Sequence, residues 1–290
     1  MQANFTIEPN LFPNEDQFTD PFFQQFNLTK ADAPLALDNG ISKHYLFPTF
    51  YADVTCAMAI FFCDYKQAEA MMPHPSMKPI KGTLGRAIVA FSCYEYKKVL
   101  NIAPYNEIAM TIPVMVGGGF SPPLLPLLMK SFKRTGYYVF SMPVTSYENQ
   151  LRGKKIWGLP KVTEAIDIYT SAGLCTTTAF DENGTNYFEL KVPTAGKLKQ
   201  FDETGFLYSV LGDELLKSQT NFKGDFTINL NAGKLFSKGE KTDSNWLKLG
   251  DSPRSTELKK LQIESDPFQF RFSKSITSCF DKSIKNWRKA

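Results

Sequence analysis

Residue types that hold metals or build disulfide frameworks are scarce in this chain. Its 290 residues include two histidines and five cysteines, and no two cysteines form a CxxC pair. His44 and His74 are not placed with cysteines at the spacing of metal ligands. We therefore expect no metal site, and we expect the cysteines to be buried free thiols in a reducing cytoplasm. The glycine run at 117–119 lacks the lysine and hydroxyl of a phosphate-binding loop, so no cofactor is predicted.

The chain also lacks a strong excess of one charge. Lysine and arginine together number 33 against 29 aspartates and glutamates, which gives a net charge of +4. The basic residues are scattered, apart from a modest run at Lys130, Lys133 and Arg134 and another at the C-terminal end. Nucleic acid is usually held by a concentrated basic face, so we expect no nucleic-acid partner.

A long uninterrupted apolar run is absent as well. The most apolar stretch, residues 108–129, is broken by prolines and by the glycine run. A membrane-spanning helix needs about 20 apolar residues without such interruption. Residues 1–10 have no charged segment followed by an apolar run, as a secretory signal would. The sequence therefore predicts a soluble, cytoplasmic protein with no membrane partner.

Bulky apolar residues are plentiful. Hydrophobic residues make up 43% of the chain, and 25 phenylalanines and 12 tyrosines are ample material for a large core. Residues 1–44 are rich in Phe, Asn, Gln, Asp and Pro, which is typical of an arm that docks aromatic side chains onto a body. No repeat or linker divides the remainder, so we predict a single domain over residues 45–290.

Short strands separated by turn residues dominate the predicted secondary structure. Apolar, β-branched and aromatic runs predict strands over residues 51–62, 87–96, 105–115, 137–143, 164–169, 174–180, 187–192 and 226–231. Helices are predicted over residues 64–72, 124–133 and 256–263. Many short strands and few helices indicate a mainly β fold, a β-rich α+β protein whose antiparallel sheets close into a barrel or cone.

Two segments contain candidate catalytic residues. Glu107 stands where a turn enters an apolar strand, and if it faces a cavity its partial desolvation suits it to proton transfer. Lys161 follows Pro160, which fixes the backbone, and Gly158, which permits a close approach. A lysine in apolar surroundings becomes a nucleophile because burial disfavours its charged form. The alternatives are a solvent-facing glutamate at a strand start and solvated lysines in a loop.

The run Gly-Lys-Lys-Ile-Trp-Gly-Leu-Pro-Lys at 153–161 resembles the Gly-Arg-Glu-x-Trp-Gly-Phe-Pro-Lys motif of the acetoacetate decarboxylase-like superfamily. The upstream Pro-Tyr-Asn-Glu-Ile, residues 104–108, resembles the glutamate-bearing strand of the same family. Residues 136–144 and, more weakly, 250–263 also fit, so the resemblance extends from about residue 50 to residue 281. The joint occurrence of the two motifs is more specific than either motif alone.

The resemblance implies an antiparallel β structure around an apolar channel and a carbon–carbon lyase that uses a Schiff base. Lys161 matches the Schiff-base lysine, and Glu107 matches a glutamate of the pocket. The substrate would be a small keto acid or ketone, and the reaction a decarboxylation or an aldol or dehydration reaction through a lysine imine. Trp157, Arg152 and Tyr105 are candidate substrate-binding residues, with an exposed turn as the alternative for Arg152 and core packing for Trp157. Relatives often form homo-oligomers, so an oligomer is expected.

The chain also departs from the family pattern. Val162 occupies the position of the second lysine of the decarboxylase proper, which removes a neighbouring cation. No carboxylate lies at residues 90–92, where a second pocket glutamate is expected, and Glu95 is the nearest. The arginine expected near Val54 is missing, and a competing register would place the lysine pair at 154–155. These losses leave open an alternative function, a non-catalytic protein that binds a small apolar ligand in the same barrel.

Overall fold

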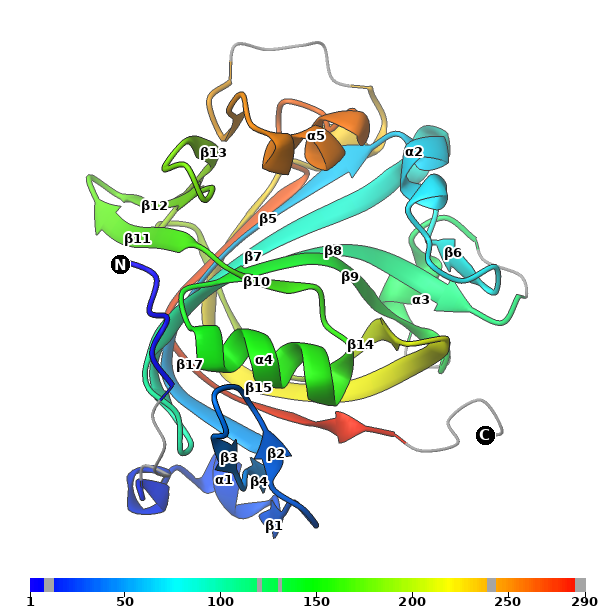
Figure 1. Cartoon of the computed structure of the whole chain (residues 1–290). Helices are drawn as coiled ribbons and strands as arrows, with labels where there is room; N and C mark the ends of the chain where they lie inside the picture. The colour runs from blue at the N-terminus through cyan, green and yellow to red at the C-terminus, as the bar shows by residue number, and fades with distance from the viewer. Residues whose placement is uncertain (8–12, 119–121, 130–131, 239–243, 285–290) are drawn as a thin grey trace.

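A closed barrel of long strands forms the centre of the molecule (Figure 1). The computed structural model describes residues 1–7, 13–118, 122–129, 132–238 and 244–284. Within these residues seven strands close in the order β9, β14, β15, β17, β5, β7 and β8, and β8 pairs with β9. All neighbours in this ring are antiparallel except β14 and β9. The predicted mainly β fold is confirmed. The barrel strands are β5 (Thr49–Cys63), β7 (Ala87–Val99), β8 (Tyr105–Val116), β9 (Thr135–Val144), β14 (Lys197–Leu211), β15 (Glu214–Leu230) and β17 (Gln269–Ser283).

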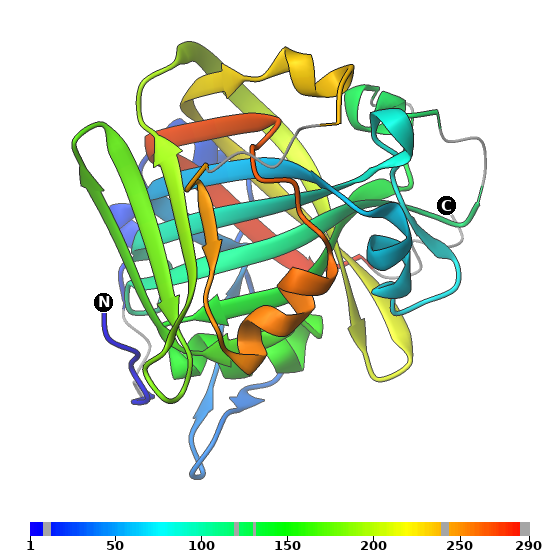
Figure 2. The ribbon, with the colours of Figure 1, turned by 90° about the horizontal axis from the view of Figure 1, so that it is seen from above.

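A second sheet and several short helices surround the barrel (Figure 2). The second sheet contains β11 (Ala165–Ser171), β12 (Leu174–Phe180), β13 (Asn186–Pro193) and β16 (Leu247–Leu249). Two strands extend the barrel sheet at its ends, β10 (Lys161–Thr163) and β6 (Met77–Pro79). The helices are α1 (Pro21–Gln24), α2 (Tyr65–Ala70), α3 (Leu125–Leu128), α4 (Tyr147–Trp157) and α5 (Pro253–Lys260), with 3-10 turns at Glu15–Gln17, Thr83–Gly85 and Ala232–Leu235.

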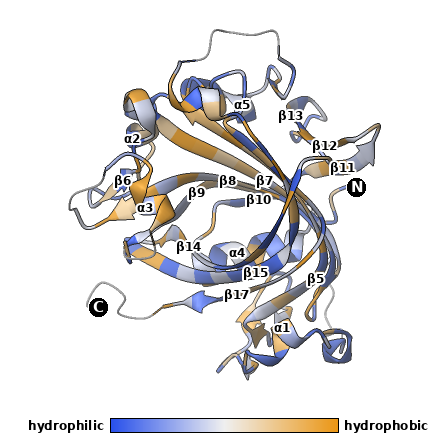
Figure 3. Cartoon of the chain, turned by 180° about the vertical axis from the view of Figure 1, so that it is seen from behind, coloured by the Kyte–Doolittle hydropathy of each residue, from blue (hydrophilic) through white to orange (hydrophobic). Residues whose placement is uncertain are grey.

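Strands β5, β7 and β8 are buried on both faces over most of their length, and alternate residues of each strand point to opposite sides. On β8, Ile108 and Met110 belong to an outer apolar cluster that also contains Phe188 of the second sheet. Ala109 belongs to an inner cluster with Phe201 and other residues from strands that do not neighbour β8. Because the second sheet packs from outside against the Ile108 and Met110 side of β8, the Glu107 and Ala109 side faces the lumen. In Figure 3 apolar colour covers the halves of β5 and β7 that lie toward α2, whereas their other halves and β14 and β15 are mixed.

The N-terminal segment lies against one end of the barrel (Figure 1). Phe18, Phe22 and Phe23 are buried and pack with Phe50 at the start of β5. Regular structure begins earlier than predicted, because three two-residue strands precede Tyr45. Two of them pair with each other, and the third pairs with a strand just after Tyr45. These strands are β1 (Thr29–Lys30), β2 (Leu35–Ala36), β3 (Ser42–Lys43) and β4 (Leu46–Phe47). The division into an arm over residues 1–44 and a domain over residues 45–290 stays a prediction.

Several predicted elements need correction. The helix predicted over residues 124–133 is limited to α3, where prolines interrupt the chain, and Lys130 lies outside the described residues, as does Gly119. The strand predicted over 226–231 is only the end of β15, and β14, β17 and α4 were not predicted. All five cysteines are free and buried, as expected. None of the helices in the described residues is long and apolar enough to cross a membrane.

Helix α4 and the turn after it set the direction of the following strand. The Ser146 side chain caps the first turn by accepting a hydrogen bond from the Asn149 backbone N–H at 3.2 Å. Gly158 ends the helix with φ of +60°, and its N–H donates to the Lys154 carbonyl. A Cβ at Gly158 would collide with the backbone of Val210 on β14. The helix terminus therefore requires glycine for two separate reasons.

Replacing Gly158 with alanine is expected to destabilise the fold more than replacing Gly173. Both glycines have positive φ, +60° and +79°, and alanine in this region costs about 1–2 kcal/mol. A Cβ at Gly173 meets nothing within 4 Å. The collision at Gly158 should therefore add about 1–3 kcal/mol to its loss. Urea unfolding measures both variants, and equal losses would show that the contact with Val210 has no energetic weight.

Candidate functional site

Lys161 projects into the barrel lumen from the first position of β10. This strand pairs in parallel with β9, and Lys161 lies opposite Met142, which belongs to the inner apolar cluster. Because alternate residues of a strand point to opposite sides, Val162 faces the outside of the barrel. Lys161 is only 5% exposed. The lysine predicted to be reactive is therefore buried and directed inward.

The side chain of Lys161 lies against the backbone of α4 at Gly153. A Cβ at Gly153 would lie 2.8 Å from Cε of Lys161 and closer still to its Cδ. Asn149, one turn earlier on the same helix, accepts a hydrogen bond from the Lys161 ammonium through Oδ1 at 2.5 Å. The Nδ2 group of Asn149 is buried and has no hydrogen-bond partner among the described residues. Asn149 thus holds the amine and leaves a donor free beside it.

The carboxylate of Glu107 completes the surroundings of the amine. The Lys161 Nζ and Glu107 Oε2 atoms are 2.6 Å apart, and both side chains are buried. Tyr96 donates a hydrogen bond from its hydroxyl to Oε1 of Glu107 at 3.3 Å. The Tyr105 ring lies 5.7 Å from the ammonium. Glu107 and Tyr105, two of the predicted site residues, are therefore brought together with Lys161.

Burial lowers the pKa of the Lys161 amine from its ordinary value of 10.5. The charge of Glu107 and its hydrogen bond act in the opposite direction, and the positive charge of Arg152 lowers the pKa further. Desolvation dominates because an ammonium is costly to bury in an apolar environment. Burial also raises the phenol pKa values of Tyr96 and Tyr105 well above their ordinary value, so both hydroxyls keep their protons.

Arg152 is buried in α4 and does not lie in an exposed turn. Its side chain is only 1% exposed, and its guanidinium lies 4.3 Å from the Tyr45 ring and 5.5 Å from the Trp157 ring. One terminal nitrogen donates to the Thr49 hydroxyl at 3.0 Å. Arg152 therefore supplies a fixed positive charge near Lys161, as the second lysine of the family was expected to do.

Trp157 has the contacts of a packing residue. Its ring lies 5.8 Å from the Phe47 ring and 4.9 Å from the Phe280 ring. Its indole N–H donates to the Asp281 carbonyl at 2.8 Å. Trp157 anchors the C-terminal turn of α4 to the end of the barrel, and the sequence-based alternative of core packing fits these contacts.

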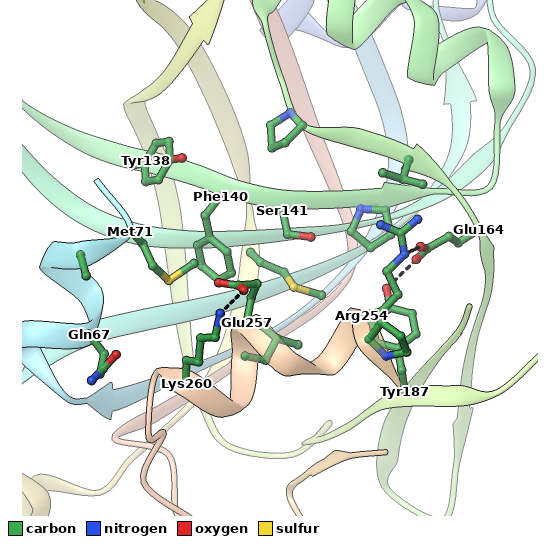
Figure 4. A pocket seen from close by; sticks show the side chains of 17 residues that line it. Gln67, Met71, Tyr138, Phe140, Ser141, Glu164, Tyr187, Arg254, Glu257 and Lys260 are labelled. Atoms are coloured by element: carbon green, nitrogen blue, oxygen red, sulfur yellow. Dashed lines mark hydrogen bonds and ion pairs between the residues drawn. The ribbon is translucent and has the colours of Figure 1, made fainter. Parts of the chain in front are cut away.

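A pocket of about 570 Å³ lies on the opposite side of β10 from the Lys161 amine. Pro160 and Val162 line it, together with residues of α2, α5, β9 and β13. At one end Glu164 accepts a hydrogen bond from the Tyr187 hydroxyl at 2.6 Å and pairs with Arg254 at 2.7 Å (Figure 4). A lysine in place of Val162 would extend into this outer pocket, away from the amine. The absence of the second lysine therefore has little effect on the electrostatic environment of the Lys161 amine.

The other candidates from the sequence lie away from the amine. Glu95 faces outward and accepts a hydrogen bond from the Thr55 hydroxyl at 3.1 Å. Lys154 and Lys155 are exposed, and the Lys155 ammonium donates to backbone carbonyls of residues 36 and 37. Of the three lysines, only Lys161 is buried in the lumen, whereas Lys154 and Lys155 of the competing register are exposed.

Asn149, Gly153 and Tyr96 were missed by the sequence reasoning. The first two stand at the spacing of one helical turn, four residues apart, and a helix prediction over residues 147–157 would have placed them on one face. Tyr96 alternates with Tyr94 along β7, a pattern that points to a shared face. No cluster of three or more metal-ligating side chains occurs in the part of the chain that the structure describes.

Comparisons with known proteins find a matching family model and solved structures of similar fold. A model of the acetoacetate decarboxylase family matches residues 32–211, which contain both Glu107 and Lys161. The crystal structure of an acetoacetate decarboxylase from Legionella pneumophila is similar over 99% of this chain and 100% of its own, with a TM-score of 0.55 and 12% identity. An acetoacetate decarboxylase-like enzyme from Sphingomonas wittichii is similar over 88% and 99%, with a TM-score of 0.53 and 13% identity. No curated protein sequence matches the chain.

Glu107→Gln and Arg152→Gln are expected to move the pKa of the Lys161 amine in opposite directions. Loss of the Glu107 carboxylate lowers this pKa further, and loss of the Arg152 charge raises it. The reactive neutral amine forms as pH rises through the pKa. Labelling of Lys161 by a small acylating reagent should therefore begin at lower pH in Glu107→Gln and at higher pH in Arg152→Gln.

Peptide mass spectrometry over a pH series measures this labelling. The exposed Lys154 is the internal control, because its labelling should follow the same profile in all three proteins. Midpoints for Lys161 that move in the same direction in both variants would contradict the assigned electrostatics.

Gly153→Ala is expected to impair the reactivity of Lys161 with little loss of stability. The added methyl displaces the lysine side chain, whereas alanine within a helix gains about 0.5–1 kcal/mol over glycine. A displacement of about 1 Å can cost about 100-fold in rate, so we expect at least a tenfold slower labelling of Lys161. The neighbouring Lys154→Ala is the control, and an unchanged labelling rate in Gly153→Ala would argue against this packing.

Proposed function

Because the chain belongs to the acetoacetate decarboxylase family, we propose that it is an enzyme in which Lys161 forms a Schiff base with a ketone or keto acid. One observation carries this proposal: the Lys161 amine is buried in the lumen, has a lowered pKa and lies between a carboxylate and an amide. Lowering the pKa of a lysine increases the fraction of neutral amine, which is the form that attacks a carbonyl carbon.

In this proposal Glu107 transfers the protons of the attack. Transfer of a proton from the ammonium to the Glu107 carboxylate, 2.6 Å away, frees the nitrogen lone pair. The nitrogen then bonds to the carbonyl carbon, and the carbonyl oxygen accepts the proton that Glu107 holds. A second proton passes from the nitrogen to the same oxygen, again through Glu107, and the oxygen leaves as water. An ammonium and a ketone thus yield a protonated imine and one water molecule.

Asn149 would orient the oxygen that is lost. Its Nδ2 group has no partner among the described residues, and its Oδ1 atom is already bound to the amine. A donor at this position can bind the carbonyl oxygen as negative charge develops on it. Tyr105 supplies a ring against the same nitrogen and would form one wall of the substrate site.

The protonated imine accepts an electron pair from a bond to the neighbouring carbon. If the bond to a carboxylate breaks, carbon dioxide leaves and an enamine forms, which is a decarboxylation. If a C–H bond breaks, its proton passes to Glu107 and the same enamine serves aldol or dehydration chemistry. A cytoplasmic location and assembly into a homo-oligomer accompany this proposal as predictions.

One observation favours a non-catalytic binding protein as the second candidate. The ion pair with Glu107 stabilises the charged, unreactive form of Lys161, in opposition to the effect of burial. A chain that had lost catalysis could keep this pair as part of the wall of an apolar site. Binding of a small apolar ligand without any covalent adduct would identify this function.

Borohydride trapping is expected to attach the substrate to Lys161. The protein is incubated with a panel of ketones and keto acids, reduced, and analysed by intact and peptide mass, because reduction converts an imine into a stable amine. We expect a ligand-dependent adduct on Lys161 and its complete loss in Lys161→Ala.

Lys161→Arg is the matched control, because a guanidinium can still pair with Glu107 but cannot form the imine. This variant should remain folded and unlabelled. An adduct on Lys154 or Lys155 would support the competing register with the same chemistry. A folded protein that forms no adduct with any member of the panel would contradict the proposed catalysis and favour the binding protein.

A further inference from the structure

Arg271 is a cation of the lumen that the proposed imine chemistry leaves without a role. It lies on β17, opposite Met58 of β5 and Ile228 of β15, and Ile228 packs against the inner apolar cluster. Its guanidinium lies 5.1 Å from the ring of Phe201, another member of that cluster. Arg271 follows the segment matched by the family model, which ends at residue 211.

The guanidinium of Arg271 forms no ion pair with any residue that the structure describes. Its Nε atom donates to the side-chain oxygen of Gln269 at 2.6 Å, and its two terminal nitrogens have no hydrogen-bond partner in the described residues. The side chain is nevertheless partly buried. Arginines removed from water are normally paired, so this one has two donors in a fixed fork available to an anion.

The surroundings of Arg271 favour an organic anion. The rings of Phe201, Phe222 and Phe226 pack against one another on the neighbouring strands β14 and β15. Burial lowers the pKa of Arg271, and the charge of Glu203 opposes this effect. An ion pair in such an environment is less screened than one at the surface. Aromatic walls beside a partly buried guanidinium that forms no ion pair in the described residues suit a carboxylate attached to a carbon chain.

Arg271 and Lys161 line the same lumen from different walls. On β7, Tyr94 lies opposite Glu107 of β8 on one side and opposite Cys56 of β5 on the other. Cys56 lies opposite residue 273, two positions from Arg271 on the same face of β17. Three strand spacings of about 4.8 Å therefore separate Glu107 from β17, roughly 14 Å around the wall. A ligand that reaches both cations must extend across the lumen.

We propose that Arg271 binds the carboxylate of the substrate, which is a keto acid whose carbonyl reacts with Lys161 and whose carboxylate lies several carbons away. This inference rests on the proposed Schiff-base function. It makes Arg271 the residue that distinguishes keto acids from ketones of the same length.

Binding of the carboxylate by Arg271 also determines which of the two reactions the imine undergoes, decarboxylation or breaking of a C–H bond. A carboxylate paired with a guanidinium is stabilised in its charged form, which opposes its conversion into carbon dioxide. A carboxylate several carbons away is also not attached to the carbon next to the imine, so its bond cannot deliver electrons there. The bond that breaks is then a C–H bond of that neighbouring carbon, whose proton passes to Glu107 and whose electrons form the enamine. The carboxylate is retained in the product.

The test compares keto acids with uncharged ketones of matched length. Probes run from 4-oxopentanoate to 6-oxoheptanoate, each beside the methyl ketone of equal chain length, and the trapped adduct on Lys161 is measured against concentration. For the best acid, Arg271→Gln should raise the half-saturating concentration about 10- to 100-fold, as expected for charge-assisted hydrogen bonds. The values for the ketones should not change.

Lys199→Gln is the matched control, because the Lys199 ammonium lies 4.8 Å from the same Phe201 ring but is exposed. It should leave both probe series unchanged, and Arg271→Lys should restore part of the preference for acids. A loss in Arg271→Gln that is equal for acids and ketones, or no loss at all, would overturn the assignment. In D₂O the wild-type protein should exchange hydrogens beside the carbonyl of the best acid without releasing carbon dioxide, and release of carbon dioxide would equally overturn it.

A separate measurement distinguishes failure of this inference from failure of the proposed function. If the wild-type protein forms no adduct with any probe, the Schiff-base proposal fails. Binding of pentanoate, hexanoate and heptanoate is then measured by calorimetry in the wild-type protein and in Arg271→Gln. Binding that disappears in the variant supports Arg271 as a carboxylate site, whereas binding that is absent or equal in both proteins overturns it.

Discussion

The buried ion pair between Lys161 and Glu107 is the interaction on which the site depends. It joins β10 to β8 across the lumen wall, and each partner would be an uncompensated charge without the other. Removing one member of a buried pair commonly costs about 3–5 kcal/mol, although a well-packed apolar pair is often as stable as the intact one. Stability alone therefore gives little reason to keep these charges in an apolar barrel. A chemical use for the amine does give one, and the lowered pKa of Lys161 is consistent with it.

Three residues of helix α4 act on the Lys161 side chain. Asn149 binds the amine, Gly153 makes room for the lysine side chain, and Arg152 contributes a positive charge that acts on the same group. The positive charge near Lys161 and the space for its side chain both come from this helix. The Ser146 cap fixes one end of the helix, and the turn at Gly158 fixes the other. The positive charge that acts on Lys161 comes from α4, whereas the strand position after the lysine is Val162.

The sequence predicted those strands and residues whose local hydrophobic pattern matches their burial in the structure. The apolar runs of β5, β7 and β8 were found because both faces of these strands are buried, and Lys161 was found because its motif is local. By contrast, β14 is largely polar and exposed over its first half, so periodicity gave no strand there. The closeness of Arg152 to Lys161, and the position of Arg271 in the lumen, depend on contacts between distant segments. Patterns within one segment carry no information about such contacts.

The parallel pairing of β10 with β9 has a consequence for how this site can change over evolution. Lys161 and Val162 are neighbours on a three-residue strand, and their side chains point to opposite sides of it. Inserting or deleting one residue between Gly158 and Pro160 would exchange them, sending the amine into the outer pocket and a valine into the lumen. Substitutions at Val162 would leave the lumen unaltered. The length of this connection is therefore more strictly constrained than the identity of the residue that follows the lysine.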